Sequence, residues 1–173
     1  MTDYTQLIPR CEEQLKKGGA FLMTGGENPN PMTIGWCQWG RIWNRDVCTV
    51  FVRPSRHSHG LIENGRFTVS VPMEDQKEAL AYCGAKSGRD GDKLAALGLG
   101  TVPPKTGGGV PGLAGACVHF ECKVLMTMQM GSKELAQLPE ACRGFYDPAS
   151  QATPDGDPHT VYFAEILEAW ESF

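Results

Sequence analysis

The sequence predicts a mainly-β fold, an antiparallel barrel or sandwich of six strands with helices inserted between them. Six short segments are rich in β-branched or aromatic residues, and the helical segments between them follow no regular β-α-β rhythm. Without that rhythm, an antiparallel sheet is favoured over a doubly wound one. At 173 residues, 41% of them hydrophobic, the chain suits one domain, residues 1–173, with a single core.

The strand pattern is clearest in residues 67–71 (Phe-Thr-Val-Ser-Val), where apolar and polar side chains alternate. Residues 116–124 also alternate, and we expect a half-buried strand there whose polar positions include His119 and Glu121. The tryptophan-containing segment 36–43 favours strand and turn. The predicted strands span residues 20–24, 32–37, 47–53, 67–71, 116–124 and 160–167.

Proline and glycine concentrate in residues 103–115, which we expect to be a long loop. Within it, residues 107–112 match G-x-G-x-x-G. They follow a proline-rich stretch and lead into a strand, so they are not a dinucleotide fingerprint. Residues 147–159 are rich in turn-forming residues. Helices are predicted at residues 7–17, 56–63, 74–83, 90–97 and 132–138.

Composition excludes several classes of function. The net charge of −4 argues against nucleic acid as a partner, because binding a phosphate backbone needs a basic face. No apolar run has transmembrane length and the N-terminus does not resemble a signal sequence, so we expect no membrane association and a cytoplasmic location. The seven cysteines include no C-x-x-C pair and read as reduced thiols. The four histidines read as surface or capping residues, and we predict no metal site.

Arg53-Pro54-Ser55-Arg56 follows an apolar strand and precedes a predicted helix. Proline ends the strand at Arg53, and Ser55 is a good N-cap for a helix that starts at Arg56. Two guanidinium groups beside free helical N–H groups favour a phosphate or carboxylate. The alternative is a surface turn whose arginines pair with nearby acids.

The segment Ser87 to Lys93 also predicts an anion site. Ser87 and Asp90 have the spacing of a capping box, which places Arg89 and Lys93 on one face of the first helical turns. Cations at a helix N-terminus oppose the helix dipole unless an anion compensates them. The alternative is a solvated helix start in which Asp90 and Asp92 neutralise the two cations.

Trp36 and Cys83 each leave two interpretations open. Packing in the core or at a subunit interface is favoured for Trp36, and stacking on a planar ligand is the alternative. A buried packing thiol is favoured for Cys83 over a redox thiol.

These motifs, taken in order, resemble the flavin reductase-like family with an FMN-binding split barrel, in its flavoredoxin branch. The resemblance covers roughly residues 20–166, and no single motif is as specific as the ordered combination. It rests on Asn30-Pro31-Met32-Thr33, Trp36, Trp39-Gly40, Ile42-Trp43, Val50-Phe51-Val52-Arg53-Pro54-Ser55-Arg56, Glu63-Asn64, Phe67-Thr68-Val69-Ser70, Tyr82-Cys83-Gly84, Lys86-Ser87-Gly88-Arg89-Asp90 and Asp92-Lys93.

The resemblance implies a six-stranded antiparallel split β-barrel with peripheral helices that forms a homodimer and binds FMN noncovalently near the subunit interface. It also implies three groups of cofactor-binding residues. The ring edge would be lined by Asn30, Met32 and Thr33, the phosphate held by Arg53, Ser55, Arg56 and Ser58, and the second anionic side of the flavin met by Ser87, Arg89 and Lys93.

The implied activity is that of an oxidoreductase that takes electrons from NAD(P)H or a redox partner protein onto FMN and passes them on. No protein base is needed for hydride transfer, so no catalytic residue is assigned. The alternative is a binding module without turnover that holds FMN, haem or another anionic ligand.

Overall fold

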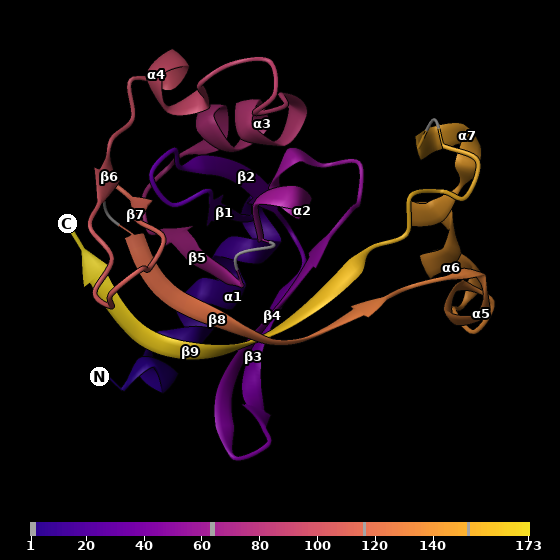
Figure 1. The fold of residues 1–173 in the computed structure, drawn as a ribbon, viewed down its shortest axis with the longest axis horizontal. Helices are drawn as coiled ribbons and strands as arrows, with labels where there is room; N and C mark the ends of the chain where they lie inside the picture. The colour runs from indigo at the N-terminus through magenta and orange to yellow at the C-terminus, as the bar shows by residue number, and fades with distance from the viewer. Residues whose placement is uncertain (1–2, 63–64, 116, 152) are drawn as a thin grey trace.

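The computed structural model describes residues 3–62, 65–115, 117–151 and 153–173. Its main feature is a seven-stranded antiparallel sheet with the order β2-β1-β5-β8-β9-β4-β3, in which β8 and β9 sweep in one long curve (Figure 1). The sheet consists of β1 (Ala20–Thr24), β2 (Asn30–Ile34), β3 (Cys37–Ile42), β4 (Arg45–Val52), β5 (Arg66–Pro72), β8 (Cys117–Gln129) and β9 (Thr160–Ser172). A separate hairpin pairs β6 (Thr101–Val102) with β7 (Gly112–Leu113).

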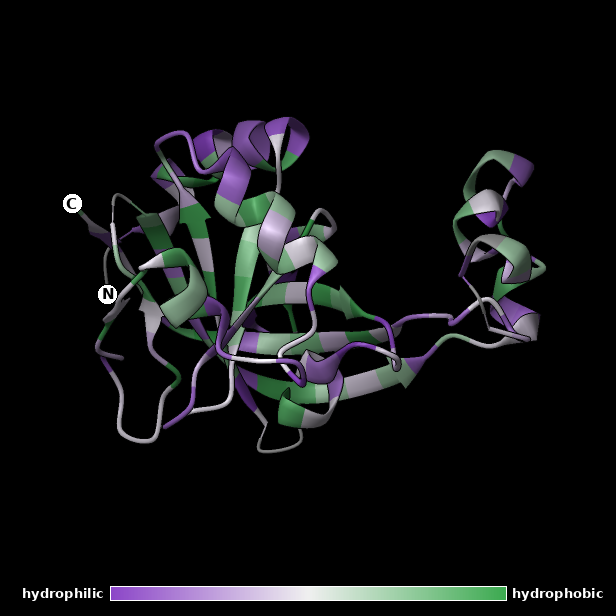
Figure 2. Ribbon diagram, turned by 90° about the horizontal axis from the view of Figure 1, so that it is seen from above, coloured by the Kyte–Doolittle hydropathy of each residue, from purple (hydrophilic) through white to green (hydrophobic). Residues whose placement is uncertain are grey.

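The described helices are short apart from two. They are η1 (Tyr4–Gln6), α1 (Ile8–Lys17), α2 (His57–Leu61), α3 (Lys77–Ala85), α4 (Lys93–Leu97), α5 (Ser132–Leu135), α6 (Glu140–Arg143), η3 (Gly144–Tyr146) and α7 (Pro148–Gln151). The last four lie on an excursion between β8 and β9, which we call the arm (residues 131–159). The helices of the arm stand apart from the rest of the molecule in both views (Figures 1 and 2).

The mainly-β antiparallel prediction is confirmed, but the predicted number of strands is wrong. The seventh strand, β3, pairs with β4 in a hairpin whose loop residues Trp43 and Asn44 both have positive φ, 52° and 57°. Two such residues make the turn type that suits the twist of a two-residue hairpin. Because β3 is half-exposed or exposed throughout, it lacks the apolar pattern that marks the other strands.

Two apolar clusters lie on opposite sides of the sheet. The larger one includes Leu22, Phe67 and Phe120 and is closed by Cys11 of α1. The smaller one packs Phe21 and Met23 of β1 against the residues of α3, α4 and loop 98–115. Because β1 contributes to both, all five of its residues are buried, and four of the five are apolar.

The expectation of a half-buried strand over residues 116–124 is wrong for its first half. His119 and Glu121 are fully buried because residues 103–115, which form the predicted loop except where β7 interrupts it, cover the outer face of β8. Glu121 accepts hydrogen bonds from the backbone N–H groups of Lys105 (2.8 Å) and Thr106 (3.2 Å). His119 is bonded through its two ring nitrogens to the hydroxyls of Ser70 (2.9 Å) and Ser172 (2.7 Å). These bonds satisfy the buried polar groups and fasten the loop to the sheet.

Three residues that entered the predictions, Glu63, Asn64 and Ala116, lie outside the described residues. Within the described ranges, no helix is long and apolar enough to cross a membrane.

Candidate functional site

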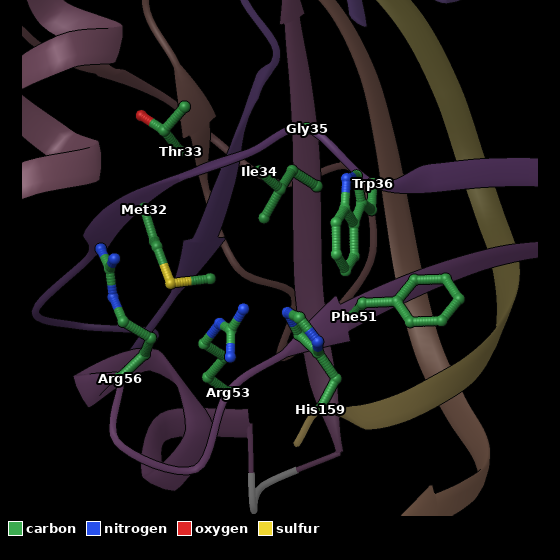
Figure 3. A pocket seen from close by; sticks show the side chains of 9 residues that line it. All are labelled: Met32, Thr33, Ile34, Gly35, Trp36, Phe51, Arg53, Arg56 and His159. Atoms are coloured by element: carbon green, nitrogen blue, oxygen red, sulfur yellow. The ribbon is translucent and has the colours of Figure 1, made fainter. Parts of the chain in front are cut away.

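The candidate site begins at β2, which is an edge strand of the main sheet. One side of its backbone has no neighbouring strand, so N–H and C=O groups there can meet a ligand. A cavity of about 210 Å³ lies against this strand and reaches the end of β4 (Figure 3). It is lined by Met32, Thr33, Ile34, Gly35, Trp36, Phe51, Arg53, Arg56 and His159.

Aromatic rings form one wall of this first cavity. The indole of Trp36 lies 4.9 Å from the His159 ring and 5.0 Å from the Phe145 ring, centroid to centroid, and 37% of the residue is exposed. His159 bonds through Nδ1 to the hydroxyl of Tyr146 at 2.9 Å. Burial, with the charge of Arg53 adding to it, lowers the pKa of His159 to about 4. The wall is therefore neutral and aromatic at physiological pH, which suits a planar ring.

A second cavity of about 560 Å³ lies beyond β2. Arg89 of the loop before α4 and Lys93, the first residue of α4, face it, and so do the carboxylates of Glu27 and Asp92. Glu27 is exposed, and Asp92 accepts hydrogen bonds from the N–H groups of Leu94 (2.9 Å) and Ala95 (3.1 Å). The lining residues are Glu27, Asn28, Pro29, Asn30, His57, Gly88, Arg89, Gly91, Asp92, Lys93, Leu94, Leu99, Gly100 and Thr101.

Lys93 is the buried cation of this second cavity. Only 4% of the residue is exposed, and its Nζ lies 3.4 Å from the carbonyl of Cys83. Burial, with a contribution from the charge of Arg56, lowers the pKa of Lys93 to about 8. The pKa of His57 is also lowered, by burial and then by the charges of Arg89 and Lys93. The positive groups therefore lie close enough to repel one another.

Arg56 joins the two cavities. Its guanidinium donates to the carbonyls of Gly84 (2.8 Å) and Cys83 (3.2 Å) at the C-terminal end of α3, where cations are favourable. It lines the first cavity, and it shares the Cys83 carbonyl with Lys93, which lines the second. Cys83 is buried in the smaller apolar cluster, as expected of a packing thiol, and burial raises the pKa of its thiol.

The expected N-cap role of Ser55 is wrong. Helix α2 begins at His57, its N-cap is Arg56, and it has no side-chain cap. The N–H of Ser55 donates to Oδ1 of Asp157 at 3.2 Å, and its hydroxyl donates to Oδ2. A carboxylate 102 residues away in the sequence holds the groups that were expected to cap the helix.

The expected capping box at Ser87 is also wrong. Helix α4 begins at Lys93 with Asp92 as its N-cap, and the hydroxyl of Ser87 instead accepts from the N–H of Arg89 at 3.2 Å. Arg89 therefore lies in the loop before the helix, not on a helical face with Lys93. The loop nevertheless brings both cations to the second cavity.

Most of the predicted binding residues gather in the two cavities. Their roles as ligands remain predictions. Ser55 and Ser87 line neither cavity, and Ser58 is buried behind the second one, where its hydroxyl accepts from the amide of Asn30 at 2.9 Å. The first cavity is lined by Met32, Thr33, Trp36, Arg53 and Arg56, and the second by Asn30, Arg89 and Lys93.

Sequence reasoning missed several lining residues. His159 was expected to be a surface or capping residue, but it is buried between Trp36 and Tyr146. No local pattern marks it, because its ring neighbours come from the β2–β3 connection (Trp36), from β4 (Phe51) and from the arm (Tyr146). His57 could have been found from its place inside the predicted anion turn.

A profile of the family described as flavin reductase like domain matches residues 16–172. The chain belongs to the flavin reductase-like family. A comparison with curated protein sequences finds no match. Solved structures of flavin reductase-like split barrels share the fold of this chain, which confirms the predicted split-barrel fold class.

Three similar structures illustrate the range of this flavin reductase-like fold. A flavoredoxin of Desulfovibrio vulgaris (Miyazaki F) has a TM-score of 0.65 at 21% identity, covering 90% of this chain and 70% of that one. An FMN-binding protein from Thermus thermophilus with bound p-hydroxybenzaldehyde has a TM-score of 0.65 at 23% identity, covering 88% and 70%. An NADH:FAD oxidoreductase of Streptomyces globisporus has a TM-score of 0.64 at 18% identity, covering 99% and 84%.

Proposed function

We propose that this protein is a flavin-dependent oxidoreductase of the flavoredoxin type that binds FMN noncovalently. The observation that carries the proposal is the pair of adjoining cavities, one with an aromatic wall beside an edge strand and one with a buried cation. FMN has the matching chemistry, a planar ring joined to a phosphate. The flavoredoxin and the FMN-binding protein among the similar structures support the choice of FMN over other anionic ligands.

The residues present fit such a group. The free edge of β2 offers backbone donors and acceptors to the ring, with Asn30, Met32 and Thr33 as the predicted contacts. Arg56 and Lys93 supply positive charge, and neither forms an ion pair within the described parts of the chain. Buried cations without a carboxylate are costly unless an anion compensates them.

The bound flavin would supply reversible electron transfer, and the protein would supply position and electrostatics. Trp36 and His159 orient a planar ring and keep water from one side of it. Arg56 and Lys93 favour negative charge on a ring held beside them, because Coulomb attraction is stronger away from bulk water. No side chain of the chain is required to act as an acid or base.

NADH or NADPH is the proposed electron donor, and a redox partner protein is the alternative source. The test is the visible absorption spectrum of the purified protein after mixing with FMN and desalting, followed by anaerobic addition of NADH or NADPH. A retained flavin spectrum that one of the two nucleotides bleaches would support the proposal. Retention without bleaching would leave a partner-driven carrier or a binding module, and a colourless protein would overturn the FMN assignment.

We further infer that the protein is a homodimer. Large apolar side chains remain exposed on the distal half of β8 and on the β3–β4 hairpin, with 44% of Met128 and 56% of Trp43 exposed. Exposed apolar surface of this kind is typical of an interface. Sedimentation velocity at micromolar concentration should show a dimer of about twice the 18.8 kDa chain mass. A monomer at that concentration would contradict this inference. FMN binding would then have to be achieved by a single chain.

A further inference from the structure

Residues 99–101 form one wall of the second cavity, and this wall is held by the hairpin of β6 and β7. Thr101 of β6 pairs with Leu113 of β7, and the carbonyl of Gly100 accepts a hydrogen bond from the N–H of Ala114 at 2.9 Å. Strand β7 in turn lies against β5 and β8 of the main sheet (Figure 1). The position of the wall therefore depends on the groups that hold β7 to the main sheet.

A relay of hydrogen bonds through the buried ring of His119 holds β7 in place. The N–H of Leu113 donates to Oγ of Ser70 at 3.0 Å, and this hydroxyl lies 2.9 Å from Nδ1 of His119. On the other side of the ring, Nε2 lies 2.7 Å from Oγ of Ser172, which donates to the carbonyl of Gly115 at 2.6 Å. One imidazole ring therefore links the end of the hairpin to both β5 and β9.

These bonds fix the position of the proton on the imidazole ring. The single hydroxyl hydrogen of Ser172 is used on Gly115, so Oγ of Ser172 accepts from Nε2–H of His119. Nδ1 is therefore bare, and it accepts from the hydroxyl of Ser70. A second proton, added at Nδ1, would set two donors against each other. The relay in its present form needs a neutral ring.

The surroundings of His119 also disfavour a charged ring. The ring is fully buried against the backbone of β7, where a Cβ on Gly112 would lie 2.5 Å from Nδ1. The charged and titratable groups around it are Lys105 of the loop and, on the same face of β8, Cys117 and Glu121. The carboxylate of Glu121 is engaged by the backbone of the loop. Burial, with a contribution from the charge of Lys105, lowers the pKa of His119 to about 4.

We propose that the relay through His119 is an acid-sensitive latch on the wall of the second cavity: protonation breaks the bond to Ser70, detaches β7 and frees residues 99–101 while the main sheet stays folded. The opening is local, because the bonds of Glu121 to the loop do not involve the ring. The consequence for a ligand rests on the proposed function, because the wall bounds one of the two cavities assigned to the flavin.

Amide hydrogen exchange of the ligand-free protein between pH 5 and pH 7, followed by mass spectrometry and corrected for the chemical exchange rate, tests the latch. A released ring regains a pKa of 6.5, whereas the latched ring keeps one of about 4. The open population of residues 99–102 and 112–115 should therefore rise about 20-fold from pH 7 to pH 5. These segments should also open at least about tenfold more often than the central strand β1. Opening equal to that of β1, or independent of pH, would overturn the inference.

Two variants separate the latch from general loosening of the loop. His119→Asn keeps an acceptor and a donor on a side chain that does not titrate. Thr68→Val is the matched control, because Thr68 is also buried on β5 and donates to the carbonyl of Val110 at 2.6 Å, in a bond that does not involve the ring.

Thr68→Val should keep the dependence on pH, and His119→Asn should reduce it to less than about twofold. Retention of the dependence in His119→Asn, or its loss in Thr68→Val, would overturn the inference. Should His119→Asn fail to fold, the wild-type comparison of the hairpin with β1 decides without it.

The dissociation rate of riboflavin measures the consequence for a ligand. Riboflavin has the flavin ring without a phosphate, so the ligand itself does not titrate in this range. Its dissociation should accelerate from pH 7 to pH 5 more in the wild type than in His119→Asn, and this difference removes the contribution of His57, which also lines the cavity. Equal acceleration in both would overturn the link between the latch and the ligand. Failure of any flavin to bind would overturn the proposed function, whereas the exchange experiment uses no ligand and decides the latch separately.

Discussion

Lys93 carries its charge into a site where a backbone carbonyl is its hydrogen-bond acceptor and water is largely excluded. A buried charge with an incomplete set of partners lowers the stability of the fold in the absence of ligand. We therefore predict that Lys93→Met raises the free energy of unfolding of the ligand-free protein by about 1 kcal/mol or more. Differential scanning calorimetry at neutral pH measures this as a higher Tm. A lower Tm would show that the ammonium group has partners sufficient to stabilise it.

The same residue predicts a pH dependence of binding. The pKa of Lys93 is lowered to about 8 in the ligand-free protein, so the side chain loses its proton as the pH rises through that value. An anion binds the charged form, and FMN affinity should therefore fall above about pH 8. Titrations between pH 6 and pH 10, roughly two pH units on either side of that pKa, test this. Each unit by which binding shifts the pKa corresponds to about 1.4 kcal/mol of binding free energy. Lys93→Met should lose the dependence, and a wild-type affinity that stays constant across the range would contradict it.

His119 predicts acid sensitivity of the fold itself. Burial, with a contribution from the charge of Lys105, lowers its pKa to about 4, against 6.5 for an unperturbed histidine. Below pH 6.5, His119 is protonated in the unfolded chain but stays neutral in the folded one. The free energy of unfolding therefore falls as the pH drops from 6.5 towards 4. Urea unfolding across this range should show a smaller slope for His119→Asn than for the wild type. An unchanged slope would mean that His119 does not titrate differently in the two states.

At the scale of elements, the loop 103–115 is held to β8 by close contact as well as by hydrogen bonds. A Cβ built on Gly109 would collide with the carboxylate of Glu121, whereas one on Gly107 would meet nothing within 4 Å. We predict that Gly109→Ala lowers the free energy of unfolding by about 1–3 kcal/mol, as overpacking typically does. Gly107→Ala should stay within about 0.5 kcal/mol of the wild type. Equal effects of the two substitutions in urea unfolding would contradict this packing.

Local pattern was enough to predict several elements. The alternation in residues 67–71 and the apolar run 20–24 correspond to β5 and β1, both central in the sheet. The helix starts at Ser55 and Ser87 were predicted from residue type and local spacing. They were wrong because the competing partners, Asp157 for Ser55 and the cap Asp92 before Lys93, were not weighed.

At the scale of the whole molecule, the sequence motifs predicted well which residues gather at the site. They predicted less well which groups each of these residues contacts. Eight of the eleven predicted binding residues line the two cavities, and Arg56 of the first shares the carbonyl of Cys83 with Lys93 of the second. The roles of Arg53 and Ser55 depend on their contacts with the arm. The two partners of each contact are about a hundred residues apart in the sequence. Contacts between segments so far apart leave no periodic signal, and His159 escaped prediction for the same reason.

The most direct test of this account is a crystal structure of the protein with FMN bound. The account predicts the ring against β2 beside Trp36 in the first cavity, with Arg56 and the buried Lys93 beside the bound cofactor. A flavin bound away from both cavities would contradict the account.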